Sequence, residues 1–451
     1  MTSENDVKVL LGDPRAAVKA MAIPLFIALL VSEVNSFADR VWCSGLGSDA
    51  IAAIAVVLPI YLVLTGLGNG LGVGGAAVVS RYIGAGDRSS AQRCASNTIL
   101  FSLVFGLALT PVLYLLMDPI LGIIGADDIN GLASEYMVYV VLMTPVLILN
   151  GAVAGLLRGE GAAKMAQFMV LMTAVLNIFL DPVLIYWMGM GVAGASFATA
   201  LASFVSTLFG IYLYISGRTY IRITLNGMRF EKTSLRTVLA VGVPQMLEYT
   251  VMYAMNIVLN LIVLMCAGSE GLTIYTVPNC IMEIAIIPAF AVGSALVPVA
   301  SSAYGQRDLG RISDAYSYSM KLAVVVVTVL VIVAFVFPEP FIHLFTYSPE
   351  MESFKGQMIE ALRIYSLYLP FFALIPVGSG LLQSIMMPNR SVICAILRNL
   401  ILISLYLFAA QYSLTAIFWA VVVGEIIGGL MIYLVTHISF RKVSDSWSGT
   451  V

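Results

Sequence analysis

The chain has 451 residues, of which 60% are hydrophobic and only 11% are charged, and its formal net charge is -2 at pH 7. Soluble proteins carry about 25% charged residues, so this composition excludes a soluble enzyme. The near balance of charges gives no reason to expect a nucleic-acid partner. Twelve spanning helices would use roughly 240 residues, which this chain can supply, so we expect it to lie in a lipid bilayer.

Apolar stretches separated by short polar connections predict twelve membrane spans. Six are expected at about 16–42, 50–80, 94–117, 134–157, 164–188 and 192–215. Six more are expected at about 237–265, 272–302, 318–337, 357–383, 391–410 and 414–436. The sequence therefore predicts an all-α integral membrane protein with a tail (1–15), a six-helix lobe (16–215), a linker (216–236), a second six-helix lobe (237–436) and a final tail (437–451).

The basic residues predict the orientation of the chain. Nineteen Lys and Arg side chains lie on the amino-terminal side of the predicted bilayer, whereas the opposite side has only Arg40, Lys355 and Arg363. Cytoplasmic loops carry the excess of positive charge in membrane proteins. Both termini and the linker are therefore expected to be cytoplasmic, in a multi-pass protein of the cell membrane.

The two halves of the chain repeat each other at a nearly constant separation. Pro24 returns as Pro244, and the Gly-Leu-Leu that begins at Gly155 returns at Gly380. A glycine and an aspartate after the second span, Gly84 and Asp87, return together as Gly305 and Asp308. Since six spans is an even number, the two repeats are parallel. Transporters with this organisation bind substrate between the repeats and rock one repeat against the other.

Several kinds of chemistry are not predicted. The five cysteines and two histidines lie far apart, with neither metal-ligand nor disulfide spacing. A phosphate-binding loop of the Gly-x4-Gly-Lys-Ser/Thr type does not occur, which excludes a single-chain ATP-driven pump. An integral-membrane enzyme would need a histidine, cysteine or carboxylate constellation that this pattern does not offer. We therefore expect no cofactor, and a transporter rather than an enzyme.

Polar residues inside the spans of the first half predict an ion site. Asp39 and Asp181 lie in the first and fifth spans, and Asn35 and Asn177 each precede an aspartate by four residues, on the same helical face. If these spans face each other, the side chains form one cluster, to which Thr199 adds a hydroxyl. Two carboxylates in a cavity of low dielectric constant favour proton uptake, while the oxygen atoms together suit Na⁺. A purely structural role in joining helices is the alternative.

The second half has a different set of charged residues. Glu248, Glu283, Arg398 and Glu425 fall inside predicted spans. Ionisable groups within a membrane are costly and are therefore functional candidates. Glu248 and Glu283 are the candidates for substrate contact, whereas Arg398 either pairs with a glutamate or contacts the substrate.

Three further features bear on packing, gating and substrate binding. Six glycines between positions 66 and 75 favour close helix packing over a dinucleotide loop, because they lie in an apolar span. Pro24 removes a backbone hydrogen bond and is expected to kink the first span. Met172 and Tyr139 belong to a set of soft and aromatic side chains that suit a cavity for varied apolar cations.

These motifs together resemble the multidrug and toxic compound extrusion (MATE) family, and more narrowly its DinF-like branch. Besides Pro24 and Asp39, the resemblance rests on Tyr-Ile-Gly-Ala-Gly-Asp (82–87), Leu-Arg-Gly-Glu-Gly (157–161), Leu-Asn-Ile-Phe-Leu-Asp-Pro (176–182), Gly-Ala-Ser-Phe-Ala-Thr (194–199) and Tyr-Gly-Gln-Arg-Asp (304–308). It covers the chain from about residue 15 to 437.

The resemblance implies two six-helix lobes around a V-shaped cleft, and export of drug-like organic cations or amphipathic compounds by H⁺ or Na⁺ antiport. It places the ion site at Asp39, Asn177, Asp181 and Thr199, with Tyr136 nearby, and a bending proline at Pro24. A working monomer is expected.

The nearest alternative is a flippase for lipid-linked oligosaccharides or polysaccharides of the same superfamily. Such a protein handles a pyrophosphate group and would be expected to place several Arg or Lys side chains in its cavity. Only Arg398 lies well inside a predicted span, which argues against that substrate.

Overall fold

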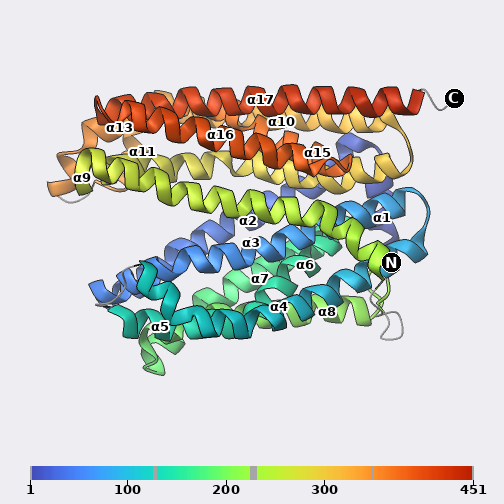
Figure 1. Ribbon diagram of the computed structural model, residues 1–451, viewed down its shortest axis with the longest axis horizontal. Coiled ribbons are helices and arrows are strands. Elements are labelled where there is room, and N and C mark those ends of the chain that lie inside the picture. The colour runs from blue at the N-terminus through green and yellow to red at the C-terminus, as the bar shows by residue number, and fades with distance from the viewer. Residues whose placement is uncertain (1–2, 125–128, 224–230, 347–348, 449–451) are drawn as a thin grey trace. The chain divides into compact units, whose positions relative to one another are not determined.

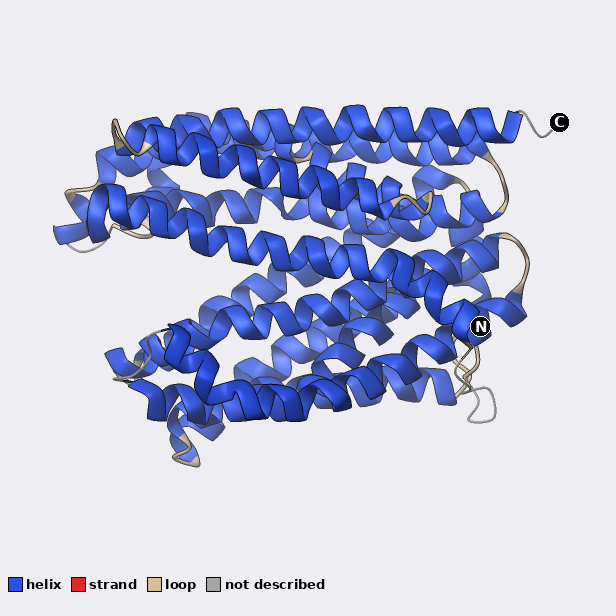
Figure 2. Ribbon diagram, in the orientation of Figure 1, coloured by secondary structure: helices blue, strands red, loops and turns tan. Residues whose placement is uncertain are grey.

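We describe the protein from a computed structural model, which covers residues 3–124, 129–223, 231–346 and 349–448 (Figure 1). Within these ranges the chain folds into helices and short connections, without a β-strand (Figure 2). Backbone groups in lipid must form hydrogen bonds inside their own segment or with a neighbouring strand, and a helix satisfies them locally. The predicted all-α class is confirmed.

The first half of the chain contains eight α-helices and one short π-helix in the described residues. They are α1 (Ser3–Leu11), α2 (Pro14–Ser44), α3 (Ser48–Gly84), α4 (Arg88–Ile124), α5 (Asn130–Leu142), α6 (Thr144–Gly159), α7 (Ala163–Pro182), η2 (Val183–Trp187) and α8 (Gly191–Ile215). The second half contains α9 (Lys232–Gly305), α10 (Leu309–Val336), α11 (Pro338–His343), α12 (Pro349–Glu352), α13 (Lys355–Ser366), α14 (Leu369–Phe372), α15 (Leu374–Ser384), α16 (Pro388–Ala409) and α17 (Leu414–Ser448).

The predicted number of membrane spans agrees with the helices. Nine helices of the described chain are long and apolar enough to cross a bilayer, and two bent helix pairs raise the number to 11. The long helix α9 has 74 residues and is interrupted at Gly268, where φ is 66° and ψ is -165°. At 1.5 Å per residue it is about 110 Å long, far more than the roughly 30 Å of a bilayer core, so it supplies two spans. The total is then twelve.

Two predicted spans are broken, which sequence analysis did not anticipate. The span at 134–157 consists of α5 and α6, bent by 50°, and the span at 357–383 consists of α13 to α15, bent by 42°. Pro145 and Pro370 stand in the first turn of the helix that follows each break. Proline lacks the N–H that would continue the preceding helix, yet it fits the start of a new one.

The predicted tails contain helical residues. The short helix α1 lies within the predicted tail 1–15, and α17 continues through Ser448, across most of the predicted tail 437–451. The predicted linker 216–236 lies partly outside the described residues.

The chain divides into two compact units. Unit 1 holds the residues up to Thr250 together with Ser301–Arg307, and unit 2 holds Val251–Ala300 and the residues from Asp308 onward. The division therefore falls inside α9, whose first part belongs with the amino-terminal helices. The polar linker at 216–236 marks the boundary between the sequence repeats, and it does not predict this boundary between the compact units.

Glycines pack α3 against α6 in unit 1. A Cβ atom on Gly155 would lie 2.2 Å from the Cα atom of Gly72, and one on Gly68 would lie 2.9 Å from the backbone of Ile148. The Ser80 hydroxyl donates a hydrogen bond of 2.7 Å to the carbonyl oxygen of Gly159 across the same contact. The glycine cluster therefore serves close helix packing, as predicted.

The same α3 helix packs closely against both ends of α9 that belong to unit 1. A Cβ atom on Gly74 would lie 2.5 Å from the carbonyl oxygen of Val238, and one on Gly84 would lie 2.0 Å from the carbonyl oxygen of Ser302. Backbone contacts this close leave no room for a side chain.

Unit 2 repeats the α3–α6 contact with fewer glycines. A Cβ atom on Gly380 of α15 would lie 2.6 Å from the carbonyl oxygen of Gly293 in α9. The Ser384 hydroxyl donates a hydrogen bond of 3.2 Å to the carbonyl oxygen of Val297. Gly293 and Gly380 are the counterparts of Gly72 and Gly155 at the separation of the repeat, so the sequence repeat is also a packing repeat.

Candidate ion site in the amino-terminal unit

The polar residues predicted to meet in the first half do so between α2, α7 and α8. Asn35 Nδ2 donates to Asn177 Oδ1 at 2.9 Å and, less closely, to Asp39 Oδ2 at 3.4 Å. Asn177 Nδ2 donates to Asp181 Oδ1 at 3.0 Å and lies 3.4 Å from Thr199 Oγ1. The two asparagines therefore bridge the two aspartates. The i, i+4 spacing in α2 and in α7 places each amide beside its carboxylate.

The two carboxyl groups of this cluster interact directly. Asp39 and Asp181 lie close enough to act on each other electrostatically. Asp181 and Asn177 are each only 1% exposed. Asp39 is half-buried. Two neighbouring carboxylates, one of them fully buried, do not both carry a full negative charge without a cation beside them. The site therefore favours the presence of at least one proton or metal cation.

Two oxygen atoms of the cluster are available to such a cation. Asn35 Oδ1 and Asp39 Oδ1 are buried and accept no hydrogen bond from the described residues. Together with the oxygen atoms of Asp181 and Thr199 they form a set of hard ligands, which suits Na⁺ better than a soft metal. Groups of three or more His, Cys, Asp or Glu that could hold a metal do not occur in the described chain. The oxygen donors of the cluster therefore fit a hard cation such as Na⁺.

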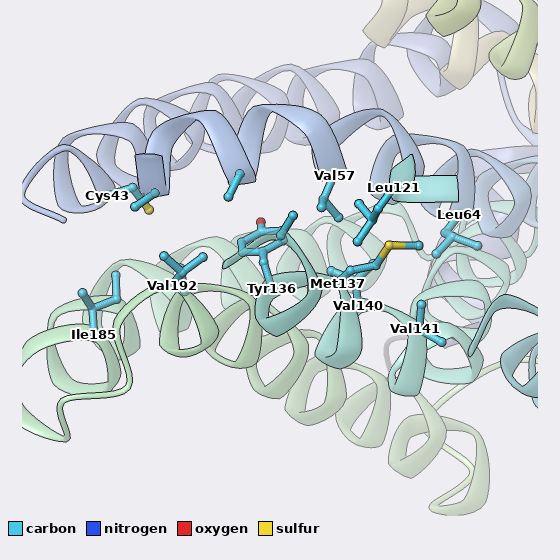
Figure 3. Close-up of a cluster of buried hydrophobic side chains, with 14 of the residues drawn as sticks. Cys43, Val57, Leu64, Leu121, Tyr136, Met137, Val140, Val141, Ile185 and Val192 are labelled. Atoms are coloured by element: carbon cyan, nitrogen blue, oxygen red, sulfur yellow. The ribbon is translucent and has the colours of Figure 1, made fainter. Parts of the chain in front are cut away.

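A cluster of apolar side chains covers one side of the site. Cys43, at the end of α2, is buried beside Asp39 and Asp181, and Tyr136 of α5 lies close to the same carboxylates. Figure 3 shows Tyr136 among Val57, Met137 and other buried side chains of α3 and α5. This packing excludes water from that side, and exclusion of water strengthens electrostatic interactions at the aspartates.

A small pocket, with room for about one water molecule, adjoins the hydroxyl of Thr199. Its walls come from α3, α5, α6 and α8 and are Tyr61, Tyr136, Val140, Met143, Leu147, Ser196, Thr199 and Ala200. The pocket combines an apolar wall with phenol and hydroxyl groups, and its size suits a small ion or a single water molecule.

The other predicted residues lie outside the cluster. Glu248 of α9 is half-buried, whereas Glu283 is exposed and accepts a hydrogen bond of 3.3 Å from Asn279 Nδ2. Met172 is half-buried on α7, and the ring of Tyr139 lies 5.2 Å from the ring of Phe197. Their contact with a substrate stays a prediction. Helix α2 continues through Pro24, and the predicted gating kink likewise stays a prediction.

Sequence reasoning missed Glu160, in the turn between α6 and α7. The side chain is 1% exposed, and its Oε2 atom accepts a hydrogen bond of 2.9 Å from the backbone N–H of Ile221. Burial raises the pKa of Glu160 from 4.5 to about 8, although the hydrogen bond from Ile221 opposes the shift. The Gly-Glu-Gly triplet at 159–161 was a signal for a tight turn, but nothing in it indicated that the charge would be buried.

Two of the four charged residues in the spans of the second half form an ion pair. Arg398 Nη1 lies 3.6 Å from Glu425 Oε2, and both side chains are largely buried. Of the two interpretations drawn from the sequence, the ion pair with a glutamate is therefore the one that the geometry supports.

The family model described as MatE matches residues 24–183 and 244–408, which together make up most of the chain. The chain belongs to the MatE family of transporters. The multidrug export protein MepA of Staphylococcus aureus (strain MRSA252) is 25% identical over 430 residues, which cover 94% of this chain and 93% of that protein.

Solved structures of MATE transporters have the same fold over the full length. The crystal structure of MATE in the straight conformation has a TM-score of 0.94 and 28% sequence identity, and covers 98% of this chain and 100% of its own. The structure of MATE in the bent conformation has a TM-score of 0.92 and 29% identity, and covers 99% of both chains. These matches confirm the predicted twelve-helix arrangement and the multi-pass membrane location. Membership of the DinF-like branch stays a prediction.

Proposed function

We propose that this MatE protein exports organic cations or other amphipathic compounds in exchange for H⁺ or Na⁺, by alternating access. The coupling ion binds at Asp39, Asn177, Asp181 and Thr199. The observation that carries the proposal is the chain of hydrogen bonds by which two asparagines bridge Asp39 and Asp181, with Asn177 and Asp181 fully buried. The relative named as a multidrug export protein supports the class of substrate.

The mechanism follows from the charge of the cluster. With the ion bound, the negative charge shared by Asp39 and Asp181 is reduced by one, and the helices that carry them can approach closely. Without the ion, the carboxylates repel each other and favour a different arrangement of α2 and α7. The substrate binds one arrangement better than the other, and the ion has the opposite preference. Such differential binding couples the two reciprocally.

Pro24 is the proposed hinge of this rearrangement. It lies in the same helix as Asp39, about four turns away, and it deprives that helix of one backbone hydrogen bond. The related MATE protein has been solved in straight and bent conformations, which supports a two-state element in this fold. Movement at Pro24 would transmit the state of the ion site along α2.

Four side chains are proposed to contact the substrate. Tyr139, Met172, Glu248 and Glu283 contribute to substrate contact, with rings and thioethers for apolar surface and carboxylates for positive charge. The protein works as a monomer in the plasma membrane, with both termini in the cytoplasm.

The decisive experiment is efflux of a fluorescent organic cation from proteoliposomes. A pH gradient and a Na⁺ gradient are imposed separately on the wild type and on the Asp39→Asn variant. We expect transport to follow one of the gradients and to vanish in the variant. Protein that is folded but inactive under both gradients would contradict antiport, and a gain in lipid-linked oligosaccharide flipping by the same vesicles would favour the flippase.

A further inference from the structure

The interior of unit 2 contains an ion pair between α16 and α17. Arg398 Nη1 lies 3.6 Å from Glu425 Oε2, and the two side chains are 12% and 11% exposed. Glu425 is the one buried carboxylate among the described residues of unit 2. A lone buried carboxylate is the kind of group that binds a coupling ion in a transporter, so its pairing with Arg398 needs an explanation.

The surroundings hold Arg398 in place on three sides. Its guanidinium lies 5.6 Å from the centre of the Phe372 ring, and Nη2 is 3.4 Å from Asn399 Oδ1. The side-chain stem crosses Gly428 of α17, where an added Cβ atom would lie 2.5 Å from Arg398 Cγ and Cδ. An arginine side chain therefore has room to reach Glu425 because position 428 is a glycine.

The charge of Glu425 is balanced mainly by Arg398. Glu425 Oε2 accepts no hydrogen bond from the part of the chain that the structure describes. Arg398 is the charged group that acts on Glu425 in the described chain, and Glu425 in turn lies near the phenols of Tyr368, in the turn before α14, and Tyr275 on α9. Neither is a cation at neutral pH. Arg398 thus takes the place that a bound cation would occupy.

Unit 2 has different residues at the positions that are equivalent to the ion ligands of unit 1. The offset that relates Gly155 to Gly380 places Leu402 and Tyr406 at the positions of Asn177 and Asp181. The Tyr406 hydroxyl lies 3.1 Å from the Tyr275 hydroxyl. Unit 2 therefore has neutral groups where unit 1 has its ion ligands, and its own buried carboxylate already has a cation.

We propose that Glu425 is a masked cation site, in which Arg398 is the resident cation and prevents binding of a second H⁺ or Na⁺. This inference rests on the proposed antiport function and adds its stoichiometry: the wild type exchanges its coupling ion in unit 1 alone. Removing one partner of a buried ion pair leaves an uncompensated charge, which the protein relieves by binding a proton or a small cation. Loss of the Arg398 charge would then create an ion site.

The test counts ions bound by the purified full-length protein in detergent. Radioactive Na⁺ measures sodium binding, and a pH indicator measures proton uptake, both per chain. The Arg398→Gln variant is expected to bind one more H⁺ or Na⁺ than the wild type. The R398Q/E425Q double variant and the R398K variant are expected to return to the wild-type number, because one has no carboxylate and the other keeps a cation.

Two glycine variants keep the test decisive if R398Q does not fold. Gly428→Ala leaves both charges present but displaces the Arg398 stem, so it is expected to increase ion binding. Gly424→Ala is the matched control, because its added Cβ would meet the Leu402 side chain instead, at 2.4 Å. It is expected to bind the wild-type number of ions.

The outcomes separate this inference from the proposed function. The masked site is wrong if folded R398Q binds no additional ion, if G428A matches G424A when R398Q is unfolded, or if E425Q alone loses an ion. The Asp181→Asn variant is measured in parallel. If it binds as many ions as the wild type, the site in unit 1 is wrong, whatever the Arg398 variants show.

Discussion

The two units use one packing scheme but place ionisable groups differently. In unit 1, Asp181 faces inward from α7 and contacts Asn177, whereas the equivalent position in unit 2 carries the phenol of Tyr406. Glycines at equivalent positions bring helices together in both units. The repeat therefore preserves backbone contacts, while the chemistry of the interior is specific to each unit.

A serine hydrogen bond shows how freely the side chains exchange roles. Ser80 of α3 donates to the carbonyl oxygen of Gly159 in α6, and Ser384 of α15 donates to the carbonyl oxygen of Val297 in α9. Position 384 is the repeat of position 159, so the donor has moved to the other helix of the pair. The contact between the helices is retained, and either helix can provide the donor.

The largest effect is expected from Asp181→Asn. This change keeps the size of the side chain but removes its charge, so coupled efflux should fall to the level of protein-free liposomes. Tyr406→Phe is the matched change in unit 2 and should leave efflux near the wild-type rate. Equal losses in both variants, measured in folded protein, would contradict the assignment of ion coupling to unit 1.

Glycine substitutions test the shared packing scheme. Gly155→Ala places a methyl group against the backbone of Gly72 and should destabilise the protein by about 1–3 kcal/mol, as overpacked cores do. Gly378→Ala in unit 2 meets the side chains of Ile432 and Thr436, at 2.9 and 3.1 Å, which can adjust. Thermal unfolding in detergent should show a clearly larger fall in Tm for G155A. A larger fall for G378A would mean that the α3–α6 contact is less important than its distances indicate.

Glu160 is expected to make stability depend on pH. Its pKa of about 8 in the folded chain exceeds its ordinary 4.5, so the folded state holds a proton that the unfolded state releases between these values. Stability should therefore decrease as the pH rises from about 4.5 to about 8. Glu160→Gln cannot ionise, so its Tm should be less dependent on pH, and at pH 8 it should exceed that of the wild type by several degrees.

The exposed Glu270 supplies the control for this experiment. Glu270→Gln should keep the wild-type dependence of Tm on pH. If E160Q and E270Q gave the same profile, the burial of Glu160 would have no consequence for stability.

The smallest effect is expected at the turns that follow the repeated helix pairs. Met386 has φ of 61° after α15, whereas unit 1 has Gly161, with φ of 86°, at the equivalent place. A side chain in this left-handed region costs of the order of 1 kcal/mol, so Met386→Gly should raise stability by at most that amount in chemical denaturation. Gly86→Ala, at φ of 76°, should lower it.

Hydrophobic periodicity, charge and residue spacing were sufficient to predict the helices and to group the polar residues of the amino-terminal unit. Asp39, Asn177, Asp181 and Thr199 could be grouped because carboxylates and amides stand out in apolar spans. The bends at Met143 and near Leu367 could not be placed, since hydropathy is continuous across them. Glu160 was missed for a related reason: its burial depends on Ile221, which lies far along the chain in a connection without any periodic pattern.

The division of α9 between the units bears on the origin of the repeat. Contacts of Gly74 with Val238 and of Gly84 with Ser302 lie inside unit 1, yet they join the two halves of the sequence. If the gene arose by duplication, a six-span ancestor had these close contacts only with a second copy of itself. That ancestor is then expected to have been an obligate homodimer, and the fused gene inherited an interface that a half-length protein could not complete alone.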